Sequence, residues 1–150
     1  MRLTGILLLA LILCSAFSDP DDFVWNLAAS GKNSGVMEQK TVIYHNHKSL
    51  LKAWASLRKA DPSLAENPPE VNFKKQLLVA CYAGSQCNGM NADSVWISNG
   101  ALHLRLIRIS IHPGCPNAKL LVTPWVWMRV NRIGWNVLKE QEKVEYRDCK

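Results

Sequence analysis

The sequence lacks the short motifs that identify common enzyme families. Its 150 residues contain no glycine-rich phosphate loop, no nucleophile elbow and no His-Glu-x-x-His zinc motif. Paired carboxylates placed for acid and base catalysis are not recognisable either. We therefore expect a protein that is not an enzyme, with no catalytic residue, no metal ion and no cofactor.

Long runs of one charge are also missing. The chain has 18 Lys and Arg against 12 Asp and Glu, which gives a formal charge of +6. The basic residues never form a run of five, so a solvated surface explains them better than a nucleic-acid-binding segment. We expect no nucleic-acid partner, whereas weak binding to acidic polymers, lost as salt rises, is compatible with this charge.

Long apolar runs are absent after the first residues of the chain. Residues 1–18 combine one basic residue, an apolar core and the small residues Ala16 and Ser18, which is typical of a cleaved signal peptide. The apolar core is shorter than the roughly 20 residues of a membrane-spanning helix, so an uncleaved anchor is the weaker alternative. The sequence predicts a secreted, extracellular protein with a loose lead-in at 19–35 and one domain at 36–150.

Cysteine is sparse, and four of the five cysteines follow the signal peptide: Cys81, Cys87, Cys115 and Cys149. An even number in an exported chain predicts two disulfides, and three pairings are open. In an antiparallel meander, the loops that contain Cys87 and Cys115 lie at the same end of the sheet. We therefore favour a bond between Cys87 and Cys115 and a second one between Cys81 and Cys149.

The alternative to the prediction of no metal site is a site formed by histidines. His45 and His47 alternate at a strand end, and His103 or His112 would supply a third ligand. Metal sites normally show a fuller ligand set, and solvent-facing histidines near a helix start are common. The prediction of no metal site is therefore kept.

The first half of the chain predicts a strand, a helix and a buried strand. Residues 41–44 favour β structure, and Asn46 is a suitable N-cap for a helix that ends near Lys59. The apolar side chains of this helix recur on one side, so its Trp54 face should pack on the sheet. Residues 77–83 form a nearly continuous apolar run, which predicts a strand covered on both faces.

The second half predicts further antiparallel strands. Residues 94–97 and 102–111 flank the Asn99-Gly100 dipeptide, which is favoured in a two-residue hairpin turn. Leucines at 102, 104 and 106 are followed by isoleucines at 107, 109 and 111, and this change of phase predicts a β-bulge after Leu106. The alternative is that the second half of this strand is covered on both faces. Residues 120–123 and 125–130 are expected to be strands, and acidic residues 140–145 a solvated C-terminal segment.

Two tryptophans on the last predicted strand allow two interpretations. Trp125 and Trp127 alternate with apolar residues and precede Arg129 on the same face. An indole stripe beside a cation can bind a flat or sugar-like ligand. Tryptophan is nevertheless mostly buried in small domains, so we favour a core position.

These elements predict an α+β fold. The expected architecture is a small, mostly antiparallel β-sheet or partial barrel with one N-terminal amphipathic helix packed on it, stabilised by disulfides. The loop at 84–91 is rich in turn-forming residues and follows the buried strand, so it is the expected display surface. The candidate partner-binding residues of this loop and of the turn at 112–118 are Gln86, Asn88, Met90 and His112.

The order of these features resembles the PrcB-type C-terminal domain. The resemblance covers residues 41–132, and it is carried by the segments PPEVNFKKQLLVACYAG, ALHLRLIRI and TPWVWMRV and by the Pro113-Gly114 turn. That family is known mainly as a non-catalytic domain of bacterial exported proteins, including an accessory subunit of a surface protease complex. The chain departs from the family pattern in the residues after Gly89 and in its four cysteines.

The resemblance implies a secreted, non-catalytic accessory module that engages a protein partner through sheet-end loops, with a protease as one candidate partner. An alternative is a structural or matrix component of an extracellular layer, in which the basic surface meets acidic polymers. A third is a protease inhibitor similar to chagasin, since that class also displays loops from the end of a sheet.

Overall fold

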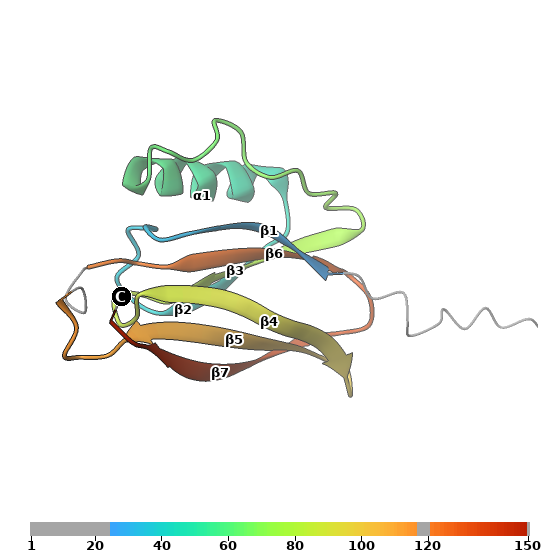
Figure 1. Cartoon of the computed structure of the whole chain (residues 1–150). Coiled ribbons are helices and arrows are strands. Elements are labelled where there is room, and N and C mark those ends of the chain that lie inside the picture. The colour runs from blue at the N-terminus through green and yellow to red at the C-terminus, as the bar shows by residue number, and fades with distance from the viewer. Residues whose placement is uncertain (1–24, 117–120, 150) are drawn as a thin grey trace, which may run out of the picture.

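A computed structural model describes residues 25–116 and 121–149, so the predicted signal peptide lies outside the described residues. The elements are β1 (Trp25–Gly31), β2 (Lys40–Tyr44), α1 (His47–Ala60), β3 (Gln76–Tyr82), β4 (Gly89–Ser98), β5 (Ala101–Ile111), β6 (Trp125–Asn131) and β7 (Val137–Arg147). They form three layers, namely the helix, a first sheet of order β1-β6-β3-β2 and a second sheet of order β4-β5-β7 (Figure 1).

The central strand β3 organises the first sheet. It pairs with β2 on one side and β6 on the other, both antiparallel. Val79 and Cys81 face the second sheet, while Leu78 and Ala80 belong to the cluster under the helix. The prediction that residues 77–83 form a strand covered on both faces is confirmed, because successive side chains of a strand point to opposite faces.

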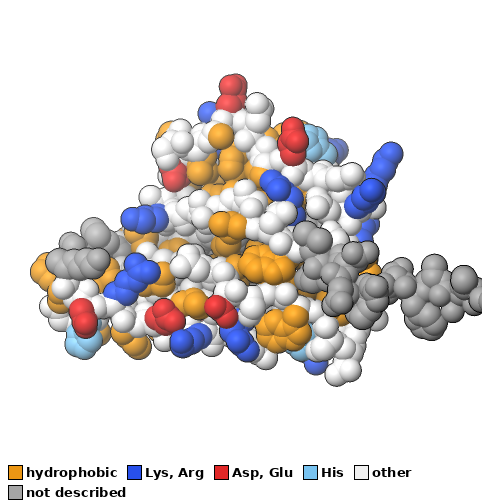
Figure 2. Space-filling model, turned by 45° about the vertical axis from the view of Figure 1, so that its right-hand side comes forward, with side chains coloured by type: hydrophobic (Ala, Val, Ile, Leu, Met, Phe, Trp, Pro, Cys, Tyr) orange, Lys and Arg blue, Asp and Glu red, His pale blue; other side chains and the backbone are white. Residues whose placement is uncertain are grey.

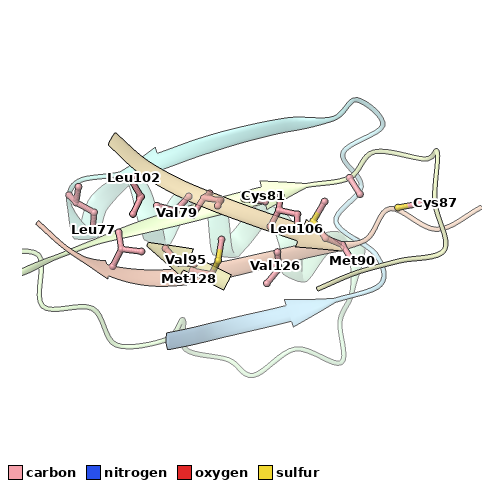
Figure 3. Packing of buried hydrophobic residues seen from close by; sticks show 13 residues of the cluster. Leu77, Val79, Cys81, Cys87, Met90, Val95, Leu102, Leu106, Val126 and Met128 are labelled. Carbon is pink, nitrogen blue, oxygen red and sulfur yellow. The ribbon is translucent and has the colours of Figure 1, made fainter. Parts of the chain in front are cut away.

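The larger core fills the space between the two sheets. Figure 3 shows Val79, Val126 and Leu106 in the middle of this layer, with Cys87 at one end. Leu102, Leu104 and Leu106 of β5 are almost completely buried there. The alternation of leucines along β5 therefore gives one sheet face its apolar surface.

Helix α1 covers the opposite face of the first sheet. Asn46 caps it, since its side-chain oxygen accepts a hydrogen bond from the Ser49 amide at 2.9 Å. The Trp54 ring packs against those of Trp127 and Trp125, at centroid distances of 5.5 and 6.2 Å. Trp125 and Trp127 have no exposed surface, which confirms that they are core residues.

The helix is nevertheless not N-terminal, because two strands precede it. Residues 25–31, expected to belong to a loose lead-in, form β1 and pair antiparallel with β6. This segment contains few β-branched residues, so its strand conformation depends on pairing with a neighbouring strand rather than on local preference. The predicted strand at 120–123 is absent from its described part, where Thr123 makes only an isolated bridge with Asn33.

The second sheet begins with the predicted hairpin. Asn99 and Gly100 both have positive φ angles, 50° and 69°, as a type I′ turn requires, and β4 and β5 pair antiparallel. The irregularity of register lies on β4 between Ala92 and Ser94, so the predicted bulge after Leu106 is wrong. The bulge changes the alternation of side chains on β4, whereas the leucines of β5 alternate regularly.

The C-terminal segment is a strand rather than a solvated tail. β7 pairs parallel with β5 over its whole length, from Ala101 opposite Val137 to Ile111 opposite Arg147. Most of its side chains are exposed because it is the edge strand of the second sheet. Its charged composition therefore reflects an edge position. Over residues 25–116 and 121–149 the fold is thus mostly antiparallel, with one parallel strand pair and one short helix.

Candidate functional site

The candidate site lies at the end of the sheets where β3, β5 and β7 terminate. We call it the sheet-end site and define it by the loop at 83–88, the turn at 112–116 and the residues at 146–149. Gly84 fixes the path of the loop, with a φ of +68°. A Cβ atom there would lie 2.7 Å from the Met37 carbonyl oxygen, so only glycine fits this crossing.

Backbone hydrogen bonds hold the base of the loop on the first sheet. The Ala83 amide donates to the Pro124 carbonyl at 2.9 Å, and the Ser85 amide donates to the Met37 carbonyl at 3.1 Å. These bonds join the loop to segments that lie far away in the sequence. The base of the loop is therefore held in one conformation by the fold itself.

Asn88 joins the loop to β5. Its backbone amide donates to the Ile109 carbonyl at 2.7 Å, and its side-chain oxygen accepts from the Ile111 amide at 3.0 Å. Asn88 is half-buried, so its main role is to hold the loop against the strand. The predicted proximity of the two loop regions at one end of the sheet is therefore confirmed.

The four predicted contact residues differ in their exposure. Gln86 and His112 are exposed, whereas Met90 is only 6 % exposed and belongs to the core between the sheets. Met90 is buried because β4 begins at Gly89, earlier than predicted, and the alternation of this strand turns Met90 inward. The assignment of Met90 to a display surface is therefore wrong.

The turn at 112–116 is attached to the end of β7. The His112 amide donates to the Arg147 carbonyl at 3.1 Å, and Cys115 forms a disulfide with Cys149. Both predicted pairings, Cys87 with Cys115 and Cys81 with Cys149, are therefore wrong. The unpredicted parallel strand β7 runs beside β5 and delivers Cys149 to Cys115.

The other two cysteines are free thiols in the core. Cys81 and Cys87 are both buried, and the Cys87 sulfur donates to the Gly89 carbonyl at 3.2 Å. Burial raises the pKa of the Cys81 thiol to about 12, so it stays protonated at neutral pH. Because the thiolate is the reactive form, Cys81 is a packing residue here.

The surface of the sheet-end site combines two hollows with exposed apolar side chains. One hollow of about 510 Å³ is lined by Asn88 and Met90, another of about 580 Å³ by Cys115 and Tyr146, and both include Ile111 and Arg147. Tyr146 is 69 % exposed. Sequence reasoning missed Tyr146 because it missed β7, although the alternation of Val144 and Tyr146 with charged residues was a usable signal.

The surrounding surface is mixed in character. Figure 2 shows hydrophobic side chains interspersed with Lys, Arg, Asp and Glu over the face in view, without one extensive apolar area. On the second sheet, Arg108 of β5 forms an ion pair with Glu142 of β7 at 3.2 Å. The Arg108 guanidinium also donates a hydrogen bond to the Gln39 side-chain oxygen at 3.0 Å. A mixed composition is common to protein surfaces and to reversible interfaces alike, so it does not by itself mark a contact surface.

The hypothetical histidine cluster does not assemble. His103 stacks on Trp96 on the second sheet, with a centroid distance of 5.0 Å, and bonds the Ser98 hydroxyl at 2.9 Å. His45 lies between β2 and α1, and His47 is the first residue of α1. Within residues 25–116 and 121–149, no three His, Cys, Asp or Glu side chains are grouped as a metal ion would require.

The described helix is too short and too polar to cross a membrane, and no other helix occurs in this part of the chain. The disulfide is consistent with an extracellular location, because such bonds persist in oxidising compartments.

Comparison with known proteins finds no matching family model, no matching curated protein and no matching solved structure. The resemblance to the PrcB-type C-terminal domain therefore stays a prediction from the sequence. Because function resides in sites rather than in folds, the chemistry of the chain's own surface has to carry any functional assignment.

Proposed function

We propose that the protein is an extracellular, non-catalytic binding module that engages a protein partner through the sheet-end site. The observation that carries this proposal is Tyr146, a large side chain that is 69 % exposed beside a hollow closed by a disulfide. Tyrosine supplies much of the binding energy at protein interfaces, because it buries a rigid ring and keeps a polar end.

The attachment of the loops supports the same proposal. The loop at 83–88 and the turn at 112–116 are joined to β5, to β7 and to Pro124 by backbone hydrogen bonds, and to Cys149 by the disulfide. A surface held in one conformation loses little conformational entropy when a partner binds. Gln86 and His112 are exposed in these two segments and offer polar side chains to a partner.

The experiment compares the two ends of the molecule. The chain is immobilised and used to capture proteins from the native extracellular fluid, as wild type and as a Gln86→Ala, His112→Ala, Tyr146→Ala variant. The matched control is Ile133→Ala, Val137→Ala, two exposed apolar residues at the opposite end, where β7 begins. The proposal expects a partner that the control retains and the sheet-end variant loses.

A partner retained equally by wild type and both variants would reject the sheet-end site as the contact surface. The narrower proposal, that the partner is a protease and that the module inhibits it, rests on the sequence resemblance and on the loop display. It is tested by assays against papain-like and trypsin-like proteases. The absence of inhibition at micromolar concentration would end the inhibitor hypothesis without affecting the binding proposal.

A second candidate function is a matrix component that binds acidic polymers. It is favoured by the outward face of the second sheet, where Lys139 and Lys143 lie on the same face as Arg105. Of these, Lys143 is paired with Glu145 at 3.1 Å and Arg105 with Asp93 at 3.8 Å, so Lys139 is the cation without an ion pair among the described residues. The Arg105 guanidinium also lies 5.4 Å from the Trp96 ring centroid. Retention on an anionic polysaccharide column that a Lys139→Gln, Lys143→Gln variant loses would support this function, and unchanged retention would contradict it.

A further inference from the structure

A separate pocket opens between α1 and the edge of the first sheet at β2. It has a volume of about 310 Å³, at the lower end of the range for small-molecule sites. Its lining contains two lysines, Lys40 and Lys52, two tyrosines, Tyr44 and Tyr82, and serines, but no Asp or Glu. The protein-binding proposal does not use any of these residues.

The tyrosines form a hydrogen-bond chain that ends in a donor. The Trp127 indole N–H donates to the Tyr82 hydroxyl at 3.2 Å, and the Tyr82 and Tyr44 hydroxyls lie 3.3 Å apart. Burial raises the pKa of Tyr82, so its phenol stays protonated. One of the two phenol hydrogens serves their mutual bond, which leaves the other with no acceptor among the described residues.

Two cations stand at the rim of the same pocket. The Lys40 ammonium lies 5.7 Å from the Tyr82 ring centroid, and neither Lys40 nor Lys52 forms an ion pair among the described residues. The whole of α1 contains no acidic residue. The pocket therefore presents two positive charges and a phenol donor without a compensating carboxylate, which is an arrangement that attracts an oxyanion.

On the helix side of the pocket, two serines provide hydrogen-bond acceptors. The Ser49 hydroxyl donates to the Asn46 carbonyl at 3.0 Å, and the Ser56 hydroxyl donates to the Lys52 carbonyl at 3.1 Å. Because their hydrogens are already used, these two oxygens offer only acceptor lone pairs to a ligand. Ala53 and Val36, both half-buried, provide an apolar surface beside the polar groups.

We propose that this pocket binds one uronate residue, a sugar ring that carries a carboxylate. The carboxylate lies between Lys40, Lys52 and the free phenol hydrogen. The ring hydroxyls donate to Ser49 and Ser56, and the C–H face packs on Ala53 and Val36. A simple carboxylic acid would leave the serine acceptors unused, and a neutral sugar would leave the lysines unused. The ligand is either a free uronate or the terminal residue of an acidic glycan.

The test is isothermal titration calorimetry of the full-length protein with glucuronate and with glucose. Glucuronate is expected to bind, and glucose to bind at least about tenfold more weakly, because only glucuronate brings a charge to the lysines. A Lys40→Gln, Lys52→Gln variant is expected to lose about tenfold in affinity for glucuronate. The matched control is Lys48→Gln, Lys59→Gln, two exposed lysines of α1 outside the pocket lining.

Several outcomes would overturn the proposal. They are equal binding of glucose and glucuronate, equal loss of affinity in the two lysine variants, or no heat with glucuronate at millimolar concentration. A tetrasaccharide with a terminal glucuronate separates the two sources, since tighter binding than that of the monomer identifies a glycan end. The Lys40→Gln, Lys52→Gln variant is also tested for capture of the protein partner. It should still capture that partner, because the substitutions change only the pocket, so the two proposals can fail separately.

Discussion

At the scale of single residues, Gly84 determines where the loop of the sheet-end site lies. Its φ of +68° belongs to the left-handed region, and a Cβ atom would approach both the Met37 carbonyl oxygen and the Gln39 amide within 3 Å. Both atoms are backbone, so neither can move without displacing the start of β2. A side chain at this position therefore strains the conformation and clashes as well.

We expect Gly84→Ala to lower the free energy of unfolding by about 3 kcal/mol, from left-handed strain and from the clash. Gly134→Ala is the control, because Gly134 has a similar φ of +65° and no atom within 4 Å of the added Cβ. The control should cost only about 1 kcal/mol. Urea denaturation measures both values. Equal losses would show that the close approach of Gly84 to the Met37 carbonyl adds nothing to the cost of a side chain at this position.

The four described cysteines differ in their chemistry, and alkylation can show this. Without a reductant, iodoacetamide should leave Cys81 and Cys87 unmodified in the native protein, because both are buried and the pKa of Cys81 is raised. After unfolding, still without a reductant, mass spectrometry should find both of them modified. A fragment that joins Cys87 to Cys115 in this experiment would contradict the structure.

At the scale of elements, the disulfide attaches the end of β7 to the turn that follows β5. It closes a loop with a sequence separation of 34 residues. We expect a Cys115→Ala, Cys149→Ala variant to lose about 3 kcal/mol of stability, because the unfolded chain regains the entropy of that loop. A reductant should destabilise the wild type by a similar amount and leave the variant unchanged.

Cys87→Ala is the matched control for this prediction. It removes a buried sulfur but no crosslink, so it should cost only about 1 kcal/mol and keep the wild-type response to a reductant. Thermal or urea unfolding with and without dithiothreitol gives the four comparisons. A wild type that does not respond to the reductant would contradict the stabilising role of the bond.

The elements that the sequence predicts well are those with a local cause. The helix at His47–Ala60 has a capping residue and an apolar stripe, and the β4–β5 hairpin has its Asn99-Gly100 turn. β3 is recognisable because both of its faces are buried. In each case the residues that define the element lie within it or next to it.

The missed elements depend on distant partners. β1 has little intrinsic preference for a strand and gains it from β6, while β7 is a charged edge strand that pairs with β5. Missing β7 also hid Tyr146 and gave the wrong cysteine pairing. Of the predicted contact residues, Met90 was misplaced because the start of β4 was predicted too late, and strand boundaries are set by pairing.

At the scale of the whole molecule, the sheet-end site and the pocket beside α1 are separate surfaces. The sheet-end site is formed by connections and strand ends, whereas the pocket proposed to bind uronate is lined by residues of α1 and β2. Figure 1 shows α1 on the face of the first sheet that lies away from the second sheet. The two surfaces share no lining residue. A protein partner and a sugar ligand can therefore be tested independently on one molecule.

The most direct test of the binding proposal places a photo-reactive amino acid at Tyr146 and, in a second protein, at Ile133. Both positions are exposed, at 69 % and 50 %, and lie at opposite ends of the molecule. Each protein is irradiated in the native extracellular fluid, and the adducts are identified by mass spectrometry. We predict one dominant protein adduct from position 146 and none of that protein from position 133. The same adduct from both positions, or from position 133 alone, would contradict a partner bound at the sheet-end site.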